Sequence, residues 1–302
     1  MDLILANWRL AAVAALFFCG VALRRADWAS ADHGRALLKF VFNVALPILI
    51  LGALTGVPLA REHAVLPITA IITSLAGWGA AAWIARRFAL PKTGEGAMVM
   101  CAMCINVSMI YPFAALSLGA AAFSQLVMFD MGHALLVWTV TTVVACKYGG
   151  HADDIPVLLK RTLGAPPLLV MIVALTLNLS GAPIPRGVLP GVLFIGQVLI
   201  LLVPLAMGLL VSARGMRRPE VIAAVVLRSG LGALLGVGLA WLFHLGAAAA
   251  IAIIGAAAPI GFTSVVLSAR EGLDLDLAAS AAAISVFLGS LWIPLAMVFV
   301  PR

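Results

Sequence analysis

The chain has 302 residues and a formal net charge of +7, and it is 64% hydrophobic and only 10% charged. Soluble proteins carry about 25% charged residues, so this chain has too few charges to cover a water-facing surface. Its mean hydropathy of +1.16 also excludes intrinsic disorder, because disordered segments are polar. The composition therefore predicts a protein that lies in a lipid bilayer.

Long apolar runs follow one another along the whole chain. A membrane-spanning helix needs about 20 mostly apolar residues, and on that basis we expect ten helices and no soluble domain. The polar stretch 147–161 predicts a cytoplasmic connecting loop between two five-helix halves, residues 1–146 and 162–302. The expected helices are 3–23, 36–57, 64–86, 96–118, 121–146, 162–181, 187–212, 219–244, 247–269 and 275–300.

Lysine and arginine are concentrated on one side of these helices. The odd-numbered loops hold fourteen of them and the opposite side holds four. Because basic residues are enriched in cytoplasmic loops, we expect a multi-pass protein of the cell inner (plasma) membrane with both termini on the non-cytoplasmic side. The fourteen are Arg24, Arg25, Arg35, Lys39, Arg86, Arg87, Lys92, Lys147, Lys160, Arg161, Arg214, Arg217, Arg218 and Arg270.

An odd number of helices per half means that the halves would insert with opposite topology, as in many secondary transporters. Pro112 in the fourth run and Pro259 in the ninth lie in corresponding helices. A proline removes a helical hydrogen bond, and such breaks persist in a membrane where they line a cavity or contact another helix. The predicted fold is therefore an all-α inverted repeat of five plus five helices, in which broken helices 4 and 9 cross.

Polar side chains gather at both predicted breaks. The half-helix that begins at Phe113 would start with amides that lack helical partners, and such an N-terminus binds anions. We therefore predict a binding site for a small organic anion where the breaks cross. Its expected residues are Asn106, Ser108, Tyr111, Pro112 and Phe113 in the first half, and Pro259, Gly261, Thr263 and Ser264 in the second.

Four further polar residues are candidates for coupling or gating. Asp130 is the one acid deep within a predicted helix, and His133 follows on the same helical face. Such a pair can share or pass a proton, although a hydrogen-bonded structural pair is the alternative. Arg228 would pair with Asp130, contact the anion or, as the favoured alternative, snorkel to the cytoplasmic face. Asn43, just before Pro47, is the fourth candidate.

Motifs for enzymatic or metal chemistry are weak. The only adjacent acids, Asp153 and Asp154, lie in the connecting loop without a second acidic motif. The pair Cys101 and Cys104 lacks the second pair or histidines of a metal site, so both are interpreted as packing residues. There is no P-loop for ATP. We therefore expect no cofactor, no metal and no enzymatic activity.

Four segments together resemble the auxin efflux carrier family, which includes bacterial malonate and malate carriers and the plant PIN proteins. They are KFVFNVALPILIL, NVSMIYPFAALSLG, MFDMGHALLVWTV and AAAPIGFTSVVLSAREGLDLDLAASA. Two positions depart from the family pattern, because Ile105 replaces a glycine before the asparagine of the break and His133 replaces an asparagine.

The resemblance implies a fold like that of sodium/proton antiporters and bile-acid symporters. Runs 1, 2, 6 and 7 would form a scaffold, and runs 3–5 and 8–10 would form a moving transport domain. Pro112 and Pro259 would be the crossing prolines, and Asn106 would face the substrate. A homodimer through the scaffold helices is suggested by the same analogy.

The expected function is transport of small carboxylates, such as malonate, malate or auxin-like acids, by elevator-type alternating access. Anion efflux gains about 2.3 kcal/mol per charge per 100 mV, so it can run as uniport, whereas uptake would need H⁺ or Na⁺. The alternatives are a cation/proton antiporter or sodium-coupled symporter on the same fold and, more remotely, an intramembrane lipid-modifying enzyme. The antiporter would be expected to carry two acids at the crossing, and none flanks either proline. No nucleic-acid partner is expected.

Overall fold

The structure, a computed structural model, is helical in all its regular elements. It describes residues 15–55, 64–110, 119–150, 160, 163–164, 166–182, 184–185, 187–210 and 215–298. Within these ranges the one extended pairing is an isolated antiparallel bridge between Ile105 and Ile260. The predicted all-α class is therefore confirmed for the described residues.

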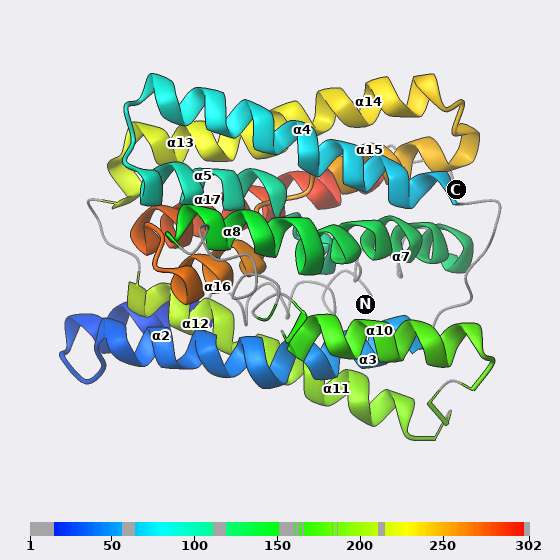
Figure 1. The fold of residues 1–302 in the computed structure, drawn as a ribbon, viewed down its shortest axis with the longest axis horizontal. Helices are drawn as coiled ribbons and strands as arrows, with labels where there is room; N and C mark the ends of the chain where they lie inside the picture. Colours follow the sequence, from blue (N-terminus) through cyan, green and yellow to red (C-terminus); the bar gives the residue numbers. More distant parts are fainter. Residues whose placement is uncertain are drawn as a thin grey trace.

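The helices form two layers, which lie one above the other in Figure 1. The lower layer, here called the small layer, packs α3 against α10 and α11, and α2 against α12. Its elements are α2 (Ala31–Phe40), the π-helical turn η1 (Val41–Ala45), α3 (Leu46–Thr55), α10 (Pro166–Leu179), α11 (Leu189–Ile200) and α12 (Leu202–Leu210).

The upper layer in Figure 1, here called the large layer, contains the helices given below. Most of the buried core residues belong to it. Its first part comprises α4 (Val65–Arg87), α5 (Lys92–Met103), the 3-10 turn η3 (Val107–Met109), α7 (Gly119–Leu136), the π-helical turn η4 (Val137–Thr141) and α8 (Thr142–Tyr148). Its second part comprises η5 (Gly215–Arg217), α13 (Pro219–Val226), the π-helical turn η6 (Leu227–Leu231), α14 (Gly232–Leu242), η7 (Gly246–Ala248), α15 (Ala249–Ala257), α16 (Phe262–Glu271) and α17 (Leu275–Val298). The layers meet where α16 packs on α2 and α17 packs on α12.

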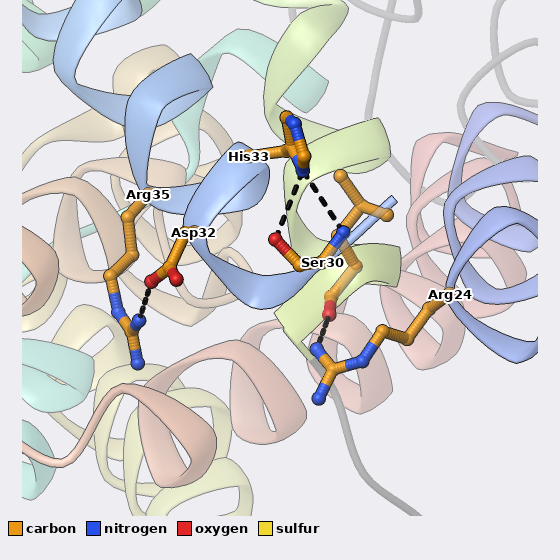
Figure 2. Close-up of polar contacts among 6 residues, drawn as sticks. Arg24, Ser30, Asp32, His33 and Arg35 are labelled. Atoms are coloured by element: carbon orange, nitrogen blue, oxygen red, sulfur yellow. Dashed lines mark hydrogen bonds and ion pairs between the residues drawn. The ribbon is translucent and has the colours of Figure 1, made fainter. Parts of the chain in front are cut away.

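The helix that contains α2 begins before the apolar run that predicts it. The run starts at residue 36, whereas α2 starts at Ala31, directly after its N-cap Ser30. Figure 2 shows the cause: the Ser30 backbone N–H donates to Nδ1 of His33 over 3.0 Å, and the Ser30 hydroxyl lies 3.0 Å from the same nitrogen. This capping box stabilises a polar first turn. Arg24, in the helical segment that precedes this turn, donates to the Leu209 carbonyl of α12 over 2.6 Å.

Five helices among the described residues are long and apolar enough to cross a membrane. They are the continuous helical segments Ala31–Gly52, Val65–Arg87, Gln125–Tyr148, Pro219–Leu242 and Leu275–Ile293. Large apolar side chains also point outward, as at Phe194, Leu234 and Trp241, which are 67%, 74% and 77% exposed. Exposed apolar faces of this extent, on helices of this length, are typical of a protein surrounded by lipid. The chain is a membrane protein.

Polar contacts join the ends of the large-layer helices on the left of Figure 1. The Tyr148 hydroxyl donates to Glu95 over 2.9 Å, and Arg218 Nη1 donates to Asp274 over 2.8 Å. The Asp274 amide donates in turn to the Thr93 carbonyl over 3.1 Å. These residues belong to predicted loops 3, 5, 7 and 9 or adjoin them, so four odd-numbered loops lie at one end of the molecule.

Candidate functional site

The ninth predicted helix is interrupted at Pro259. The helix α15 ends at Ala257 and α16 begins at Phe262, while Ala258 and Gly261 have extended backbone. Pro259 has no amide to donate, and it disfavours the helical conformation of the residue before it. The sequence-based prediction of a break at Pro259 is therefore confirmed.

The fourth predicted helix is interrupted earlier than the sequence predicts. The helix α5 ends at Met103, Cys104 is extended, and helical structure resumes only as the short turn η3 at Val107. The prediction centred this break on Pro112, which lies eight positions after Cys104. Pro112, together with the predicted site residues Tyr111 and Phe113, lies outside the described residues.

The two interruptions cross and pair with each other. The Asn106 amide donates to the Pro259 carbonyl, and the Gly261 amide donates to the Cys104 carbonyl, each over 2.8 Å. These bonds flank the bridge between Ile105 and Ile260. The pairing explains why the first helix ends before any proline, because its backbone groups bond to the other half. Gly261 is required for the close approach, since a Cβ there would lie 2.8 Å from the Ile105 carbonyl oxygen.

A side chain accepts the hydrogen bond of each bridging isoleucine. The Ile105 amide donates to Nε2 of His133 on α7, and the Ile260 amide donates to Oγ of Ser285 on α17, each over 2.9 Å. Both side chains are buried. Sequence reasoning missed Ser285, because a serine in an alanine-rich run has no distinctive pattern. The only available signal was its position in the chain. Ser285 follows Ile260 by 25 residues, and His133 follows Ile105 by a similar 28 residues.

Asp130 and His133 lie together, as their spacing predicts. The distance from His133 Nδ1 to Asp130 Oδ1 is 3.5 Å, and the side chains of His133 and Asp130 are 7% and 29% exposed. Because Nε2 accepts the Ile105 amide, the proton of a neutral imidazole lies on Nδ1 and faces Asp130. The pair is thus connected to the crossing through one hydrogen bond.

Arg228 contradicts the favoured expectation that it snorkels to the cytoplasmic face. It is 2% exposed and lies at the crossing. Its Nη1 donates to the Ala102 carbonyl of α5 over 2.8 Å, and its Nη2 donates to the Ala256 carbonyl of α15. Snorkelling fails because these carbonyls, at the ends of two interrupted helices, attract a cation within the protein.

The remaining predicted residues take several positions. Asn106 is 3% exposed in the crossing, and Thr263 is half-buried in the first turn of α16. The buried Ser264 hydroxyl, in the first turn of α16, donates to the Gly261 carbonyl over 2.8 Å. Ser108 lies in η3, and its side chain is outside the described residues.

Asn43 lies away from this group of residues. It is exposed on η1 in the small layer, where its Nδ2 donates to the Lys39 carbonyl of the same helix over 2.7 Å. The structure therefore brings Asn106, His133, Arg228, Pro259, Gly261, Thr263 and Ser264 to the crossing, with Asp130 next to His133, and it does not bring Asn43 there.

The crossing favours negative charge. The N-terminus of α16 points its amide dipoles there, and the buried positive charge of Arg228 balances the carbonyl ends of α5 and α15. Throughout the part of the chain that the structure describes, no three His, Cys, Asp or Glu side chains gather to hold a metal ion. A surface hollow of about 380 Å³ is lined by residues between Arg24 and Arg35 and includes none of the crossing residues.

No protein-family model and no curated protein matches the chain. The geometry of the crossing is therefore the basis of the functional conclusion.

Proposed function

We propose that this protein is a secondary carrier of small organic anions of the auxin efflux carrier family, with carboxylates such as malonate, malate or auxin-like acids as substrates. The crossing of residues 104–106 with residues 258–261 carries the proposal. Non-helical backbone at membrane depth is tolerated only where it is buried in protein or lines a water-filled cavity. Carriers place their substrate sites where such interrupted helices meet.

The charges near the crossing support an anion rather than a metal cation as the substrate. The α16 N-terminus is positive, Arg228 balances the negative C-terminal ends of α5 and α15, and Asp130 lies beside His133. The amide of Asn106 adds a polar side chain of the kind that hydrogen-bonds a carboxylate. The cation/proton antiporter is disfavoured because Arg228 takes two of the carbonyl oxygens that a cation would need.

The arrangement of helices supports an inverted repeat of ten membrane helices. His133 and Ser285 have the same task in the two halves, each accepting the amide of a bridging isoleucine from a helix that follows the break. The large layer contains both breaks, so in our proposal it moves past the small layer and carries the anion across the membrane. This movement is the elevator form of alternating access.

Proton coupling is the second candidate feature of this carrier. It is favoured by the position of the Asp130–His133 pair, one hydrogen bond from the crossing. In this proposal efflux of an anion runs down the membrane potential without a coupling ion, and uptake uses the pair to bind a proton.

A ligand screen on the purified protein tests the proposed function. Malonate, malate and acetate are added singly, and the melting temperature is recorded for the wild type, Asn106→Ala and Asn178→Ala. A bound ligand at 100 times its Kd stabilises the folded state by about 2.7 kcal/mol. We expect at least one carboxylate to stabilise the wild type and Asn178→Ala, which alters an amide in the small layer on α10, but not Asn106→Ala. A wild type that no carboxylate stabilises would contradict the proposal.

A further inference from the structure

Arg228 holds two backbone carbonyls that the crossing leaves without their helical partners. In a continuous helix the Ala102 carbonyl would accept the Asn106 amide, and the Ala256 carbonyl would accept the Ile260 amide. Here the Asn106 amide donates to Pro259, and the Ile260 amide donates to Ser285. The guanidinium of Arg228 supplies both missing donors.

These two carbonyls are also the negative ends of two helices. Ala102 is next to the last residue of α5, and Ala256 is next to the last residue of α15. Each helix C-terminus carries about half a negative charge, so one guanidinium balances the two. In transporters with interrupted helices, such C-terminal carbonyls are the groups that coordinate Na⁺.

We propose that Arg228 is a built-in cation, which occupies the carbonyl oxygens that a coupling Na⁺ would otherwise bind. This inference rests on the proposed function and deepens it, because it assigns the coupling: carboxylate binding at the crossing needs no metal cation. The charge that neutralises the two helix ends belongs to the chain and moves with the large layer.

The packing around Arg228 is suited to holding one compact cation. Arg228 lies in the π-helical turn η6, one helical turn before Gly232. A Cβ at Gly232 would lie 2.0 Å from the Ala256 carbonyl oxygen and 2.6 Å from Arg228 Nη2. The missing side chain therefore leaves room for the guanidinium between α14 and α15. Removing the Arg228 side chain would leave a polar space with carbonyl oxygens on two sides.

The test compares cations rather than substrates alone. The wild type, Arg228→Ala and Arg228→Gln are purified in choline chloride, and malonate-induced changes of melting temperature are measured with added NaCl or with guanidinium chloride well below denaturing concentrations. We expect the wild type to bind malonate equally well with and without Na⁺. In choline, Arg228→Ala should bind malonate about tenfold or more weakly, because a hydrogen-bonded charge is lost. Added guanidinium or Na⁺ should restore the affinity of this variant for malonate.

The small cation should also stabilise Arg228→Ala without malonate, by occupying the vacated carbonyls, whereas the same cation should not stabilise the wild type. This second readout separates the inference from the proposed function, since it needs no carboxylate to bind. Arg228→Gln keeps a neutral hydrogen-bond donor of intermediate size, and it replaces Arg228→Ala in the test if Arg228→Ala does not fold. Malonate binding by Arg228→Gln should depend on Na⁺. A wild type that requires Na⁺ for malonate, or variants that no small cation restores or stabilises, would overturn the inference.

Discussion

His133 and Ser285 accept equivalent backbone amides but differ in chemistry. Both accept a hydrogen bond of 2.9 Å from a bridging isoleucine. The serine hydroxyl keeps this role at any pH, whereas a histidine that gains a second ring proton loses its acceptor. Each half of the crossing therefore has one such bond, which a ring nitrogen accepts in the first half and a hydroxyl accepts in the second.

Replacing Ser285 by alanine should destabilise the protein. The Ile260 amide would lose its acceptor inside the protein, and an unsatisfied buried donor costs about 1–3 kcal/mol. Ser280→Ala is the matched control on the same helix, because the buried Ser280 hydroxyl has no hydrogen-bond partner within the described residues. Melting temperatures in detergent would measure both variants. Equal destabilisation by the two substitutions would show that the Ser285 hydrogen bond contributes nothing.

Replacing Asp130 by asparagine should alter the pH dependence of carboxylate flux in proteoliposomes. The substitution keeps the shape of the side chain but removes the charge that lies 3.5 Å from His133 Nδ1. The charged form of the imidazole then loses its nearby counter-charge. Initial rates at a series of pH values would measure the effect. If both proteins gave the same profile, the pair would have no part in coupling.

At the scale of helices, apolar run length predicts where the chain is helical, but it does not predict where a helix is interrupted. The predicted runs 64–86 and 219–244 match the helical segments 65–87 and 219–242 closely. The end of α5 at Met103 was not predictable, because its cause is hydrogen bonding to residues more than 150 positions away. A proline marks a break locally, whereas a pairing partner leaves no local signal.

The same limit explains the wrong expectation for Arg228. Its partners are the backbone carbonyls of Ala102 and Ala256, which are 126 and 28 residues distant in sequence. Every residue has a carbonyl, so the side chains at those positions give no indication of the contact. Asp130 and His133, by contrast, were paired correctly because their contact lies within one helix and follows from its period.

Close packing of α14 on α15 should make Gly232 intolerant of substitution. In Gly232→Ala the new Cβ would meet the Ala256 carbonyl oxygen at 2.0 Å, so the helices must separate. Overpacking of this kind costs about 1–3 kcal/mol. Gly238→Ala on the same helix meets nothing within 4 Å and should gain about 0.5–1 kcal/mol from helix propensity. Thermal unfolding would measure both, and a tolerated Gly232→Ala would contradict the packing.

For the whole molecule, the positive-inside pattern and the fold agree on which loops share a side. Loops 3, 5, 7 and 9 are joined by contacts such as Tyr148 with Glu95 and Arg218 with Asp274. An alternating path of helices would place these loops together, and a missed or additional helix would separate them. The sequence thus predicts the relative sidedness of the loops, while their cytoplasmic position remains a prediction from charge.

Labelling of single cysteines should place Lys147→Cys and Ala182→Cys on opposite sides of the membrane. Both positions are exposed, the first at the end of α8 and the second after α10. The background is Cys19→Ser, because Cys19 is exposed while the other three cysteines are buried. A membrane-impermeant maleimide added to intact cells should label Ala182→Cys, because odd loops retain positive charge inside. Labelling of Lys147→Cys from outside the cell would show that the protein has the opposite orientation in the membrane.

The two bonds that join one half of the crossing to the other link peptide groups, which every amino acid has. Asn106 contributes its amide and Pro259 its carbonyl, and neither side chain enters that bond. Substitutions can therefore change the side chains around the crossing while these backbone bonds between the two halves are kept. In the proposed carrier, the choice of anion could therefore change during evolution without a change of fold.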